Sequence, residues 1–600
     1  MNNFSKKSLR VIPGLLLLGG AAISANPVRS VHADDGSTDT LFCLKNPDSS
    51  TCTGYGEGLS AGGQAALFGS QDTTGDGNNN PQPGYHDNGR GGNTFVNDPC
   101  LDPPAPNRRR TVQSETEIAT FGKYMVAGYN RSNGFYDNTQ GLSGYAYSVN
   151  GGNTWVDGSG LPPAIPTPGV SPFAPGNDGY FGDPILVVDK SARTFSSSGT
   201  PATTQAPGVF YYSSIYKLPN GTFNIAVNRG TFQTAPPQTT ESVSDTRCLN
   251  DPTQQGVPNT KNLPTERIVW EKPVVAVPGT VSQANDFLDK EWLYVSQATG
   301  ELYLTYTRFG SDGSTPLELV RSMDGGRTWT PPSVIVPNLD DTFNQATQPM
   351  VTSTGRVIVT WIARTFAAGG SGPESQDRIE MTYSDNDGTT FRNPVTVVAY
   401  VNPQGEPNGY NRGRRSILNA PYIAPETDGT NVYITYFSGT TPLTTPGGDI
   451  YTGRLGKSGN IFLASSHDNG NTFTSTKVND DATTTSHVFP SVQVNKNHFV
   501  YVGWLDRRND SSNVLTDAWA AVSKDAGATF SPNREQTDVA TSWYVRADAR
   551  PNMGDYTSSE LLNDNQFVMI WADGRFPPPS PTPQAGTPDT IFTIANGLGD

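Results

Sequence analysis

Charged residues, cysteines and histidines are all scarce in this 600-residue chain. Charged residues make up 16% of it, against about 25% in an ordinary globular protein, which excludes a coiled coil or a charge-rich disordered chain. The 4 cysteines are too few for a disulfide scaffold, and the 5 scattered histidines argue against a His-based zinc site. Acidic residues outnumber basic ones, for a net charge of −15. We therefore expect no nucleic-acid partner.

Long hydrophobic runs are also lacking, except for one near the N-terminus. Three basic residues within the first ten precede an apolar run at residues 11–25, which is shorter than the about 20 residues that span a bilayer. Small-residue cleavage patterns end at Ala25 and Ala33. We predict a signal peptide over residues 1–33 and a secreted, extracellular chain without a membrane span. An uncleaved N-terminal anchor is the alternative.

Glycine and proline are abundant, with 63 and 48 copies. This composition is typical of many short strands joined by turns, so the predicted fold class is all-β.

A short pattern, Ser-x-Asp/Asn-x-Gly-x-Thr-aromatic, occurs five times. The five copies, called the boxed turns below, are Ser148–Trp155, Ser322–Trp329, Ser384–Phe391, Ser466–Phe473 and Ser523–Phe530. The Asp or Asn side chain can bond the backbone of its own turn, glycine permits positive φ, and the Thr and aromatic residue begin the next strand. The pattern therefore predicts hairpin turns with a folding role.

The segments before the boxed turns predict a repeated four-stranded antiparallel unit, which is the blade of a β-propeller. Pairs of β-rich runs begin near residues 115, 183, 291, 347, 420, 489 and 555, so we predict seven blades. In the second unit, Gly208–Ser213 is interpreted as the third strand and Asn220–Phe223 as an eroded boxed turn. Six blades is the alternative, if residues 183–223 are an insertion. A segment upstream of Glu115 is expected to supply the missing strand of the last blade.

The predicted organisation is a signal peptide, an irregular N-terminal arm over residues 34–110 and a propeller over residues 111–600. Residues 228–268 are interpreted as an insertion between blades. The oxygen-rich stretch at residues 72–80 suits calcium but lacks the final bidentate Glu, so we interpret it as a solvated turn and expect no cofactor. The four cysteines allow three pairings, of which we favour Cys43–Cys52 and Cys100–Cys248.

The boxed turns and the blade pattern together resemble the Asp-box (BNR) repeat family, whose best-known members are sialidases. The resemblance implies a propeller that removes terminal sialic acids with a Tyr nucleophile, an acid/base Asp and three arginines that hold the substrate carboxylate. Arg550-Pro-Asn-Met-Gly-Asp-Tyr-Thr557 resembles the stretch that carries the nucleophile. The resemblance thus implies Tyr556 as nucleophile and Arg550 as a carboxylate ligand. The Arg-Ile-Pro start motif of the family is absent, and a seventh blade departs from its six-bladed ring.

Other candidate residues come from their positions, because the innermost strands of a propeller begin or end at its axis. Polar residues open these strands at Glu115, Glu117, Asp183, Asp289-Lys290-Glu291, Gln348, Asn419, His487 and Asp555. From this group we predict Glu115, Asp183 and Glu291 as catalytic acids, and Asp289 and Asp555 as substrate ligands. Arg414 and Arg415, in a basic cluster, are predicted to clamp an anionic sugar. No metal site is expected.

Two similar segments end second strands of the repeat, Trp504-Leu-Asp-Arg-Arg508 and Trp571-Ala-Asp-Gly-Arg575. Their repetition indicates structural Asp–Arg pairs.

The sequence therefore predicts a sialidase-like glycoside hydrolase whose partners are extracellular carbohydrates or glycoproteins, and which is a monomer. The alternative is a non-catalytic propeller that binds glycan or protein.

Overall fold

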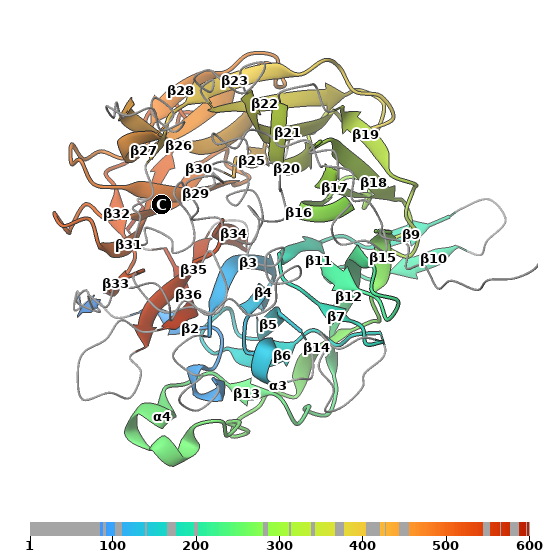
Figure 1. Ribbon diagram of the computed structural model, residues 1–600, viewed down its shortest axis with the longest axis vertical. Coiled ribbons are helices and arrows are strands. Elements are labelled where there is room, and N and C mark those ends of the chain that lie inside the picture. Colours follow the sequence, from blue (N-terminus) through green and yellow to red (C-terminus); the bar gives the residue numbers. More distant parts are fainter. Residues whose placement is uncertain are drawn as a thin grey trace, which may run out of the picture.

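The computed structural model shows an all-β protein whose strands are arranged in seven blades around a central axis (Figure 1). It describes residues 85–87, 92–102, 111–137, 141–164, 176–196, 202–279, 286–310, 314–337, 342–365, 377–403, 420–426, 428–442, 455–543, 553–563, 566–576, 587–595 and 597–598. The signal-peptide region, the calcium-like stretch, Cys43 and Cys52 lie outside these residues.

Each blade is an antiparallel sheet whose first strand is innermost. The first blade is formed by β3 (Gln113–Phe121), β4 (Tyr124–Arg131), β5 (Ser143–Ser148) and β6 (Val156–Gly160). The second is formed by β7 (Gly179–Tyr180) with β8 (Ile185–Asp189), then β11 (Val209–Lys217), β12 (Phe223–Thr234), and β14 (Glu266–Trp270) with β15 (Val274–Val277). The third is formed by β16 (Asp286–Val295), β17 (Leu302–Gly310), β18 (Leu317–Ser322) and β19 (Ser333–Val336).

The other four blades follow the same order. They are formed by β20 (Thr342–Val351), β21 (Val357–Thr365), β22 (Asp377–Ser384) and β23 (Val395–Tyr400); by β25 (Tyr422–Pro425), β26 (Val432–Pro442), β27 (Leu455–Ser466) and β28 (Thr474–Lys477); by β29 (His487–Val494), β30 (Val500–Asp506), β31 (Leu515–Ser523) and β32 (Arg534–Glu535) with β33 (Val539–Ser542); and by β34 (Ser558–Leu562), β35 (Gln566–Phe576), β36 (Thr587–Ile594) and β2 (Thr94–Phe95).

The ring closes on itself. The innermost strands contact one another in the order β3, β8, β16, β20, β25, β29, β34 and back to β3. The last blade takes its outer strand from the N-terminal arm, since Thr94 pairs with Phe592 and Phe95 with Ile591. In Figure 1 the blue β2 accordingly lies beside the red β36. The seven-bladed prediction and the closing strand upstream of Glu115 are both confirmed.

The second blade corrects two details of the sequence interpretation. Residues 209–213, predicted as part of the third strand, belong to β11, which is the second strand of the blade and pairs with β8. The turn at Asn220–Phe223 therefore joins the second and third strands, whereas boxed turns join third and fourth strands. The predicted order is wrong here because an additional hairpin, β9 (Arg193–Phe195) with β10 (Thr203–Gln205), lies between the first and second strands. The expected insertion lies within this blade, between β12 and β14.

The five boxed turns each join the third and fourth strands of a blade and share one hydrogen-bond pattern. The backbone N–H of the Gly donates to the Ser hydroxyl at 2.8–3.0 Å. The backbone N–H of the Thr donates to the Asp or Asn Oδ1, also at 2.8–3.0 Å. These bonds satisfy the backbone of a sharp turn, so the boxed turns have the predicted folding role.

The two Trp-x-Asp segments form the predicted Asp–Arg pairs. The indole N–H of Trp504 donates to Asp506 at 2.8 Å, and Arg508 pairs with the same carboxylate. Trp571, Asp573 and Arg575 repeat this arrangement, with an indole bond of 2.9 Å.

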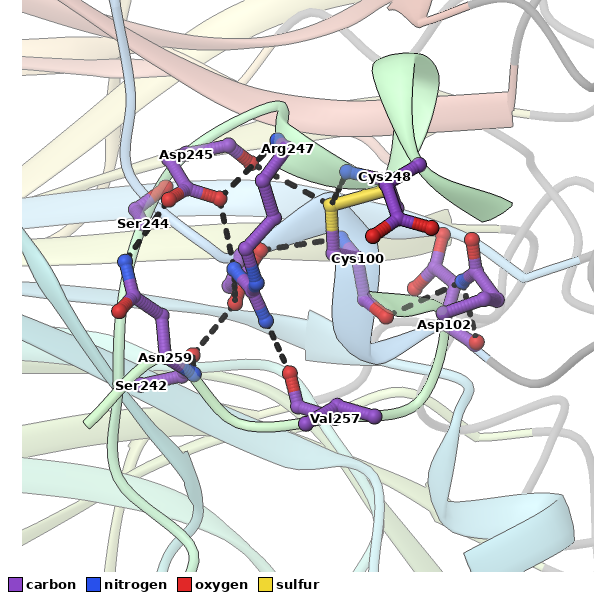
Figure 2. Close-up of a disulfide and its surroundings, with 12 residues drawn as sticks. Cys100, Asp102, Ser242, Ser244, Asp245, Arg247, Cys248, Val257 and Asn259 are labelled. Atoms are coloured by element: carbon purple, nitrogen blue, oxygen red, sulfur yellow. Dashed lines mark hydrogen bonds and ion pairs between the residues drawn. A yellow bond between two sulfur atoms is a disulfide. The ribbon is translucent and has the colours of Figure 1, made fainter. Parts of the chain in front are cut away.

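A disulfide between Cys100 and Cys248 ties the N-terminal arm to the insertion of the second blade, as predicted (Figure 2). Arg247, beside Cys248, donates to Asp98 at 3.0 Å and to Asp245 at 2.6 Å, which braces the link from both sides. The same insertion contributes β13 (Ser242–Val243), which extends the first blade by pairing with β6.

Candidate functional site at the propeller axis

The innermost strands carry a repeated backbone irregularity where they begin. The pairing with the second strand shifts register by one residue between Ser114 and Glu117, and the same occurs in the third, fourth and sixth blades. At this point the backbone takes a positive φ, of 52–75°, in six blades: Glu115, Asp183, Lys290, Ala346, Phe489 and Gly554. A β-bulge turns a side chain away from the regular alternation. The bulges thus direct side chains from successive blades toward the axis.

Gly554 shows how closely the blades approach here. A Cβ at Gly554 would lie 2.4 Å from Cγ of Glu115, and its φ of 75° is one that other residues rarely adopt. The last blade and the first are therefore in direct contact at the axis, beside Asp555.

The bulges divide the axis into a charged half and an apolar half. The second, third, seventh and first blades contribute six charged residues, called the axial cluster below: Glu115, Asp183, Asp289, Lys290, Glu291 and Asp555. All six side chains are buried. Ala346, Ala420 and Phe489, from the fourth to sixth blades, are also buried but carry no charge.

Lys290 is the cation of the axial cluster. Its ammonium forms a close ion pair with Asp555 and lies 3.6 Å from an oxygen of Glu115. Burial alone would lower the pKa of Lys290, but the surrounding carboxylates raise it, so the ammonium stays charged. One ammonium cannot balance five buried carboxyl groups, so some of these carboxyls must retain protons.

The protons are held by the acids nearest one another. Burial and the adjacent Asp289 raise the pKa of Asp183 to about 7. Burial and the charge of Asp183 raise the pKa of Glu115 well above its ordinary value, and the two side chains are hydrogen-bonded. Asn130 fixes this pair, because its amide donates to Glu115 at 2.7 Å while its carbonyl accepts from the backbone N–H of Asp183 at 3.0 Å. The arrangement keeps a proton that can be given up near neutral pH.

Glu291 faces a small cavity. Neither of its carboxyl oxygens has a hydrogen-bond partner from another described residue, although its side chain is buried. Burial, followed by the charge of Asp183, raises its pKa well above the ordinary value. The cavity, of about 10 Å³, is lined by Asp183, Lys290 and Glu291 on one side and by Ala346 and Ala420 on the other, and is large enough for about one water molecule.

Tyr556 lines the same cavity. Its side chain is 4% exposed, and its hydroxyl donates to the backbone carbonyl of Pro184 at 3.0 Å. Burial and then the charges of Glu115 and Asp183 raise its pKa well above the ordinary value. The predicted substrate ligands Arg414, Arg415 and Arg550 lie outside the described residues.

An aromatic layer separates the axial cluster from the rest of the axis. The ring of Trp292 contacts those of Tyr422 and Tyr556 edge-on, at centroid distances of 5.1 and 5.5 Å. Tyr422 in turn donates to the buried carboxyl of Glu117 at 2.7 Å. Glu117, Trp292 and Tyr556 each lie two positions after the positive-φ residue of their blade, which explains why they meet in one layer.

His487 lies at the start of β29 in a separate polar cluster. Its Nδ1 lies 2.6 Å from the carbonyl oxygen of Gly459, and its Nε2 lies 3.0 Å from Asp481 and 3.3 Å from Asp506. It is therefore a structural residue beside the Asp506–Arg508 pair. The remaining polar position of the set, Asn419, lies outside the described residues.

Sequence reasoning assembled the acids of the axial cluster but missed residues that organise it. Asn130, Trp292 and Tyr422 are not among the predicted site residues. The bulge supplies the missing signal, because it places the residue two positions after Glu115, Lys290 or Gly554 in a common layer.

The described residues contain no helix long and apolar enough to cross a membrane.

No protein-family model matches this chain, and no curated protein matches it. Among solved structures, it is similar to the GH93 alpha-L-arabinofuranosidase of Fusarium graminearum, with 11% identity and a TM-score of 0.39 over 84% of this chain and 97% of that chain. Trypanosoma rangeli sialidase in complex with the inhibitor DANA gives 13% identity and a TM-score of 0.35 over 69% of this chain and 55% of that chain. A PL25 ulvan lyase gives 11% identity and a TM-score of 0.40 over 85% of this chain and 95% of that chain. Activity does not transfer between chains at such values.

Proposed function

We propose that this protein is a secreted, sialidase-like glycoside hydrolase of the Asp-box family that acts on extracellular glycans as a monomer. The observation that carries the proposal is the axial cluster, in which acids from four blades share protons around one cation. Glycosidic bond cleavage needs an acid that is protonated near neutral pH next to groups that are ionised. The five boxed turns, with their common hydrogen bonds, support membership of the family.

In the proposed reaction Asp183 is the acid, because its pKa of about 7 lets it both hold and release a proton. It protonates the glycosidic oxygen as the bond to the anomeric carbon breaks, and it later accepts a proton from the attacking water. Glu115, hydrogen-bonded to Asp183, tunes that pKa, and Glu291, once it is ionised, faces the developing positive charge of the sugar. Asp289 and Asp555 are proposed to bind substrate hydroxyls.

Tyr556 is the proposed nucleophile. Its oxygen bonds to the anomeric carbon as the protonated leaving group departs, and its proton passes to Glu115 or Glu291, whose charges act on Tyr556. Because burial raises the pKa of both carboxyls, this step requires a pH at which one of them has lost its proton. When water attacks the anomeric carbon, the bond to Tyr556 breaks and the proton returns to its oxygen. The recognition of a sugar carboxylate is assigned to Arg414, Arg415 and Arg550 on the strength of the sequence alone.

A non-catalytic propeller that binds glycan or protein is the second candidate. It is favoured by the burial of Tyr556, whose hydroxyl is bonded to the Pro184 carbonyl, and by the small size of the axial cavity. A nucleophile has to reach the anomeric carbon, and the buried Tyr556 does not meet this requirement. In a non-catalytic protein the acids of the axial cluster have a structural role in the propeller.

The deciding experiment measures hydrolysis of an aryl sialoside and a panel of neutral aryl glycosides. We expect turnover of at least one substrate, a loss of at least a hundredfold in kcat for Asp183→Asn, and a comparable loss for Tyr556→Phe. Tyr212→Phe is the matched control, because Tyr212 is also buried and donates to a backbone carbonyl, that of Gly144, at 2.8 Å. Absence of turnover on every substrate contradicts the enzyme and favours the binding module.

A further inference from the structure

A second cavity lies on the far side of the aromatic layer. It is a channel of about 470 Å³ between the innermost strands, lined among others by Glu117, Gln348, Tyr422 and Ser559. Its volume lies within the about 300–1,000 Å³ that is usual for small-molecule sites. Trp292 borders both this channel and the small cavity at the axial cluster.

The channel lies toward the face of the boxed turns. Neighbouring strands of a blade are antiparallel, so the turn after the first strand and the turn after the third lie at the same end. A hydrogen bond confirms this in the first blade, where Gly151 of the boxed turn donates to the carbonyl of Lys123, in the turn between β3 and β4, at 2.9 Å. The channel is therefore distinct from the axial cluster, which lies where the innermost strands begin.

Two buried polar groups on the channel wall lack partners. The amide nitrogen of Gln348 and the hydroxyl of Ser559 have no hydrogen-bond partner among the described residues, although their side chains are only 1% and 3% exposed. A buried donor without a partner costs about 1–3 kcal/mol. Both groups line the channel, so a ligand with acceptor oxygens can satisfy them.

The charges of the channel argue against an anionic ligand, since the carboxyls of Glu426 and Glu560 also line it. Lys190, its cation among the described lining residues, is paired with Glu560 at 3.8 Å, so no free cation is offered to an anion there. Burial raises the pKa of Glu117 to about 8, which keeps this carboxyl protonated at neutral pH. The wall thus offers amide, hydroxyl and carboxyl groups next to the aromatic rings of Trp292 and Tyr422.

We propose that this channel binds a neutral polyhydroxy ligand, a single uncharged sugar ring, with hydroxyl oxygens on Gln348 and Ser559 and its apolar face against Trp292. An uncharged sugar supplies both acceptors and donors to the wall and carries an apolar face that an aromatic ring can cover. The proposal concerns a site other than the axial cluster and does not depend on the proposed hydrolysis.

The test measures binding of D-glucose, D-galactose, L-arabinose and L-rhamnose by saturation-transfer NMR and calorimetry, with N-acetylneuraminic acid as the anionic arm. We expect at least one neutral sugar to bind, and Gln348→Leu to weaken that binding about tenfold. Gln345→Leu is the matched control, because Gln345 lies in the same strand, is equally buried and also has an unpartnered amide nitrogen, but does not line the channel.

A second variant keeps the test decisive if Gln348→Leu does not fold. Ser559→Ala removes one hydroxyl and should weaken binding severalfold, and quenching of tryptophan fluorescence by the sugar should disappear in Trp292→Phe. The proposal is overturned if no neutral sugar binds, if only the anionic sugar binds, or if the channel variants bind as well as Gln345→Leu. None of these outcomes bears on hydrolysis, which is measured separately with aryl glycosides.

Discussion

Replacing Glu117 by glutamine should make the stability of this protein less dependent on pH. Glu117 is 5% exposed, and burial raises its pKa to about 8 from the ordinary 4.5. The hydroxyl of Tyr422 donates to this carboxyl, and the amide oxygen of glutamine can accept the same hydrogen bond. The substitution therefore removes the titration while it keeps the contact.

The sign follows from the direction of the shift. Between pH 4.5 and pH 8 the unfolded chain loses the Glu117 proton while the folded chain keeps it, so folding becomes less favourable as the pH rises. Each pH unit costs about 1.4 kcal/mol in this range. From pH 5 to pH 7.5 the wild-type protein should lose about 3 kcal/mol of unfolding free energy through this one group, and Glu117→Gln should not.

The assay is equilibrium urea unfolding at pH 5 and pH 7.5, approached from the folded and the unfolded side. The quantity of interest is the difference in unfolding free energy between Glu117→Gln and the wild type, which should grow by about 3 kcal/mol over this pH range. Asp387→Asn, which removes an exposed carboxyl in a boxed turn, controls for the loss of one carboxyl. An equal difference at both pH values would refute the assignment of a protonated Glu117.

Three further changes test other parts of the structure. Lys290→Met should lower the unfolding free energy by about 3–5 kcal/mol at pH 8 and by less at pH 5, because Asp183, whose charge acts on Lys290, has a pKa of about 7 and is protonated at pH 5; a loss that does not depend on pH would contradict the role of Lys290 as the counter-ion of Asp183. The double variant Cys100→Ser, Cys248→Ser opens a link across 148 residues and should cost about 2–5 kcal/mol in urea unfolding, whereas an unchanged midpoint would show that the insertion is held by other contacts. Ser466→Ala leaves the buried backbone N–H of Gly470 without its acceptor at 2.9 Å and should cost about 1–3 kcal/mol; a stability equal to that of the wild type would mean that water replaces the hydroxyl.

The fold could be predicted from the sequence because its signals are local. The boxed turns fix where third and fourth strands meet, and the β-rich pairs before them fix the number of blades. The one misplaced turn, at Asn220–Phe223, lies in the blade whose first two strands are separated by the additional β9–β10 hairpin. There the spacing no longer reports the order of the strands.

The candidate site could be predicted only in part, because its geometry comes from contacts between blades. The sequence places Glu115, Asp183 and Glu291 at the starts of innermost strands, but does not show that a bulge directs them to one point or that Lys290 pairs with Asp555. It also cannot show that Trp292 closes the axis between two cavities, since this depends on how seven strands meet around the ring. Such contacts form only when the propeller ring closes, and they have no local sequence signal.

The closing strand has a consequence for the order in which the chain can fold. Asn97, next to β2, bonds to Asp589 across 492 residues, so β2 is synthesised long before β36, the strand with which it pairs. Until β36 is made, β2 lacks this partner. The edge of β36 then stays open until β2 reaches it, and long-range pairings of this kind form slowly. The same edge accepts β2 from any copy of the chain, so crowded, incompletely folded molecules are expected to exchange this strand and form linked dimers.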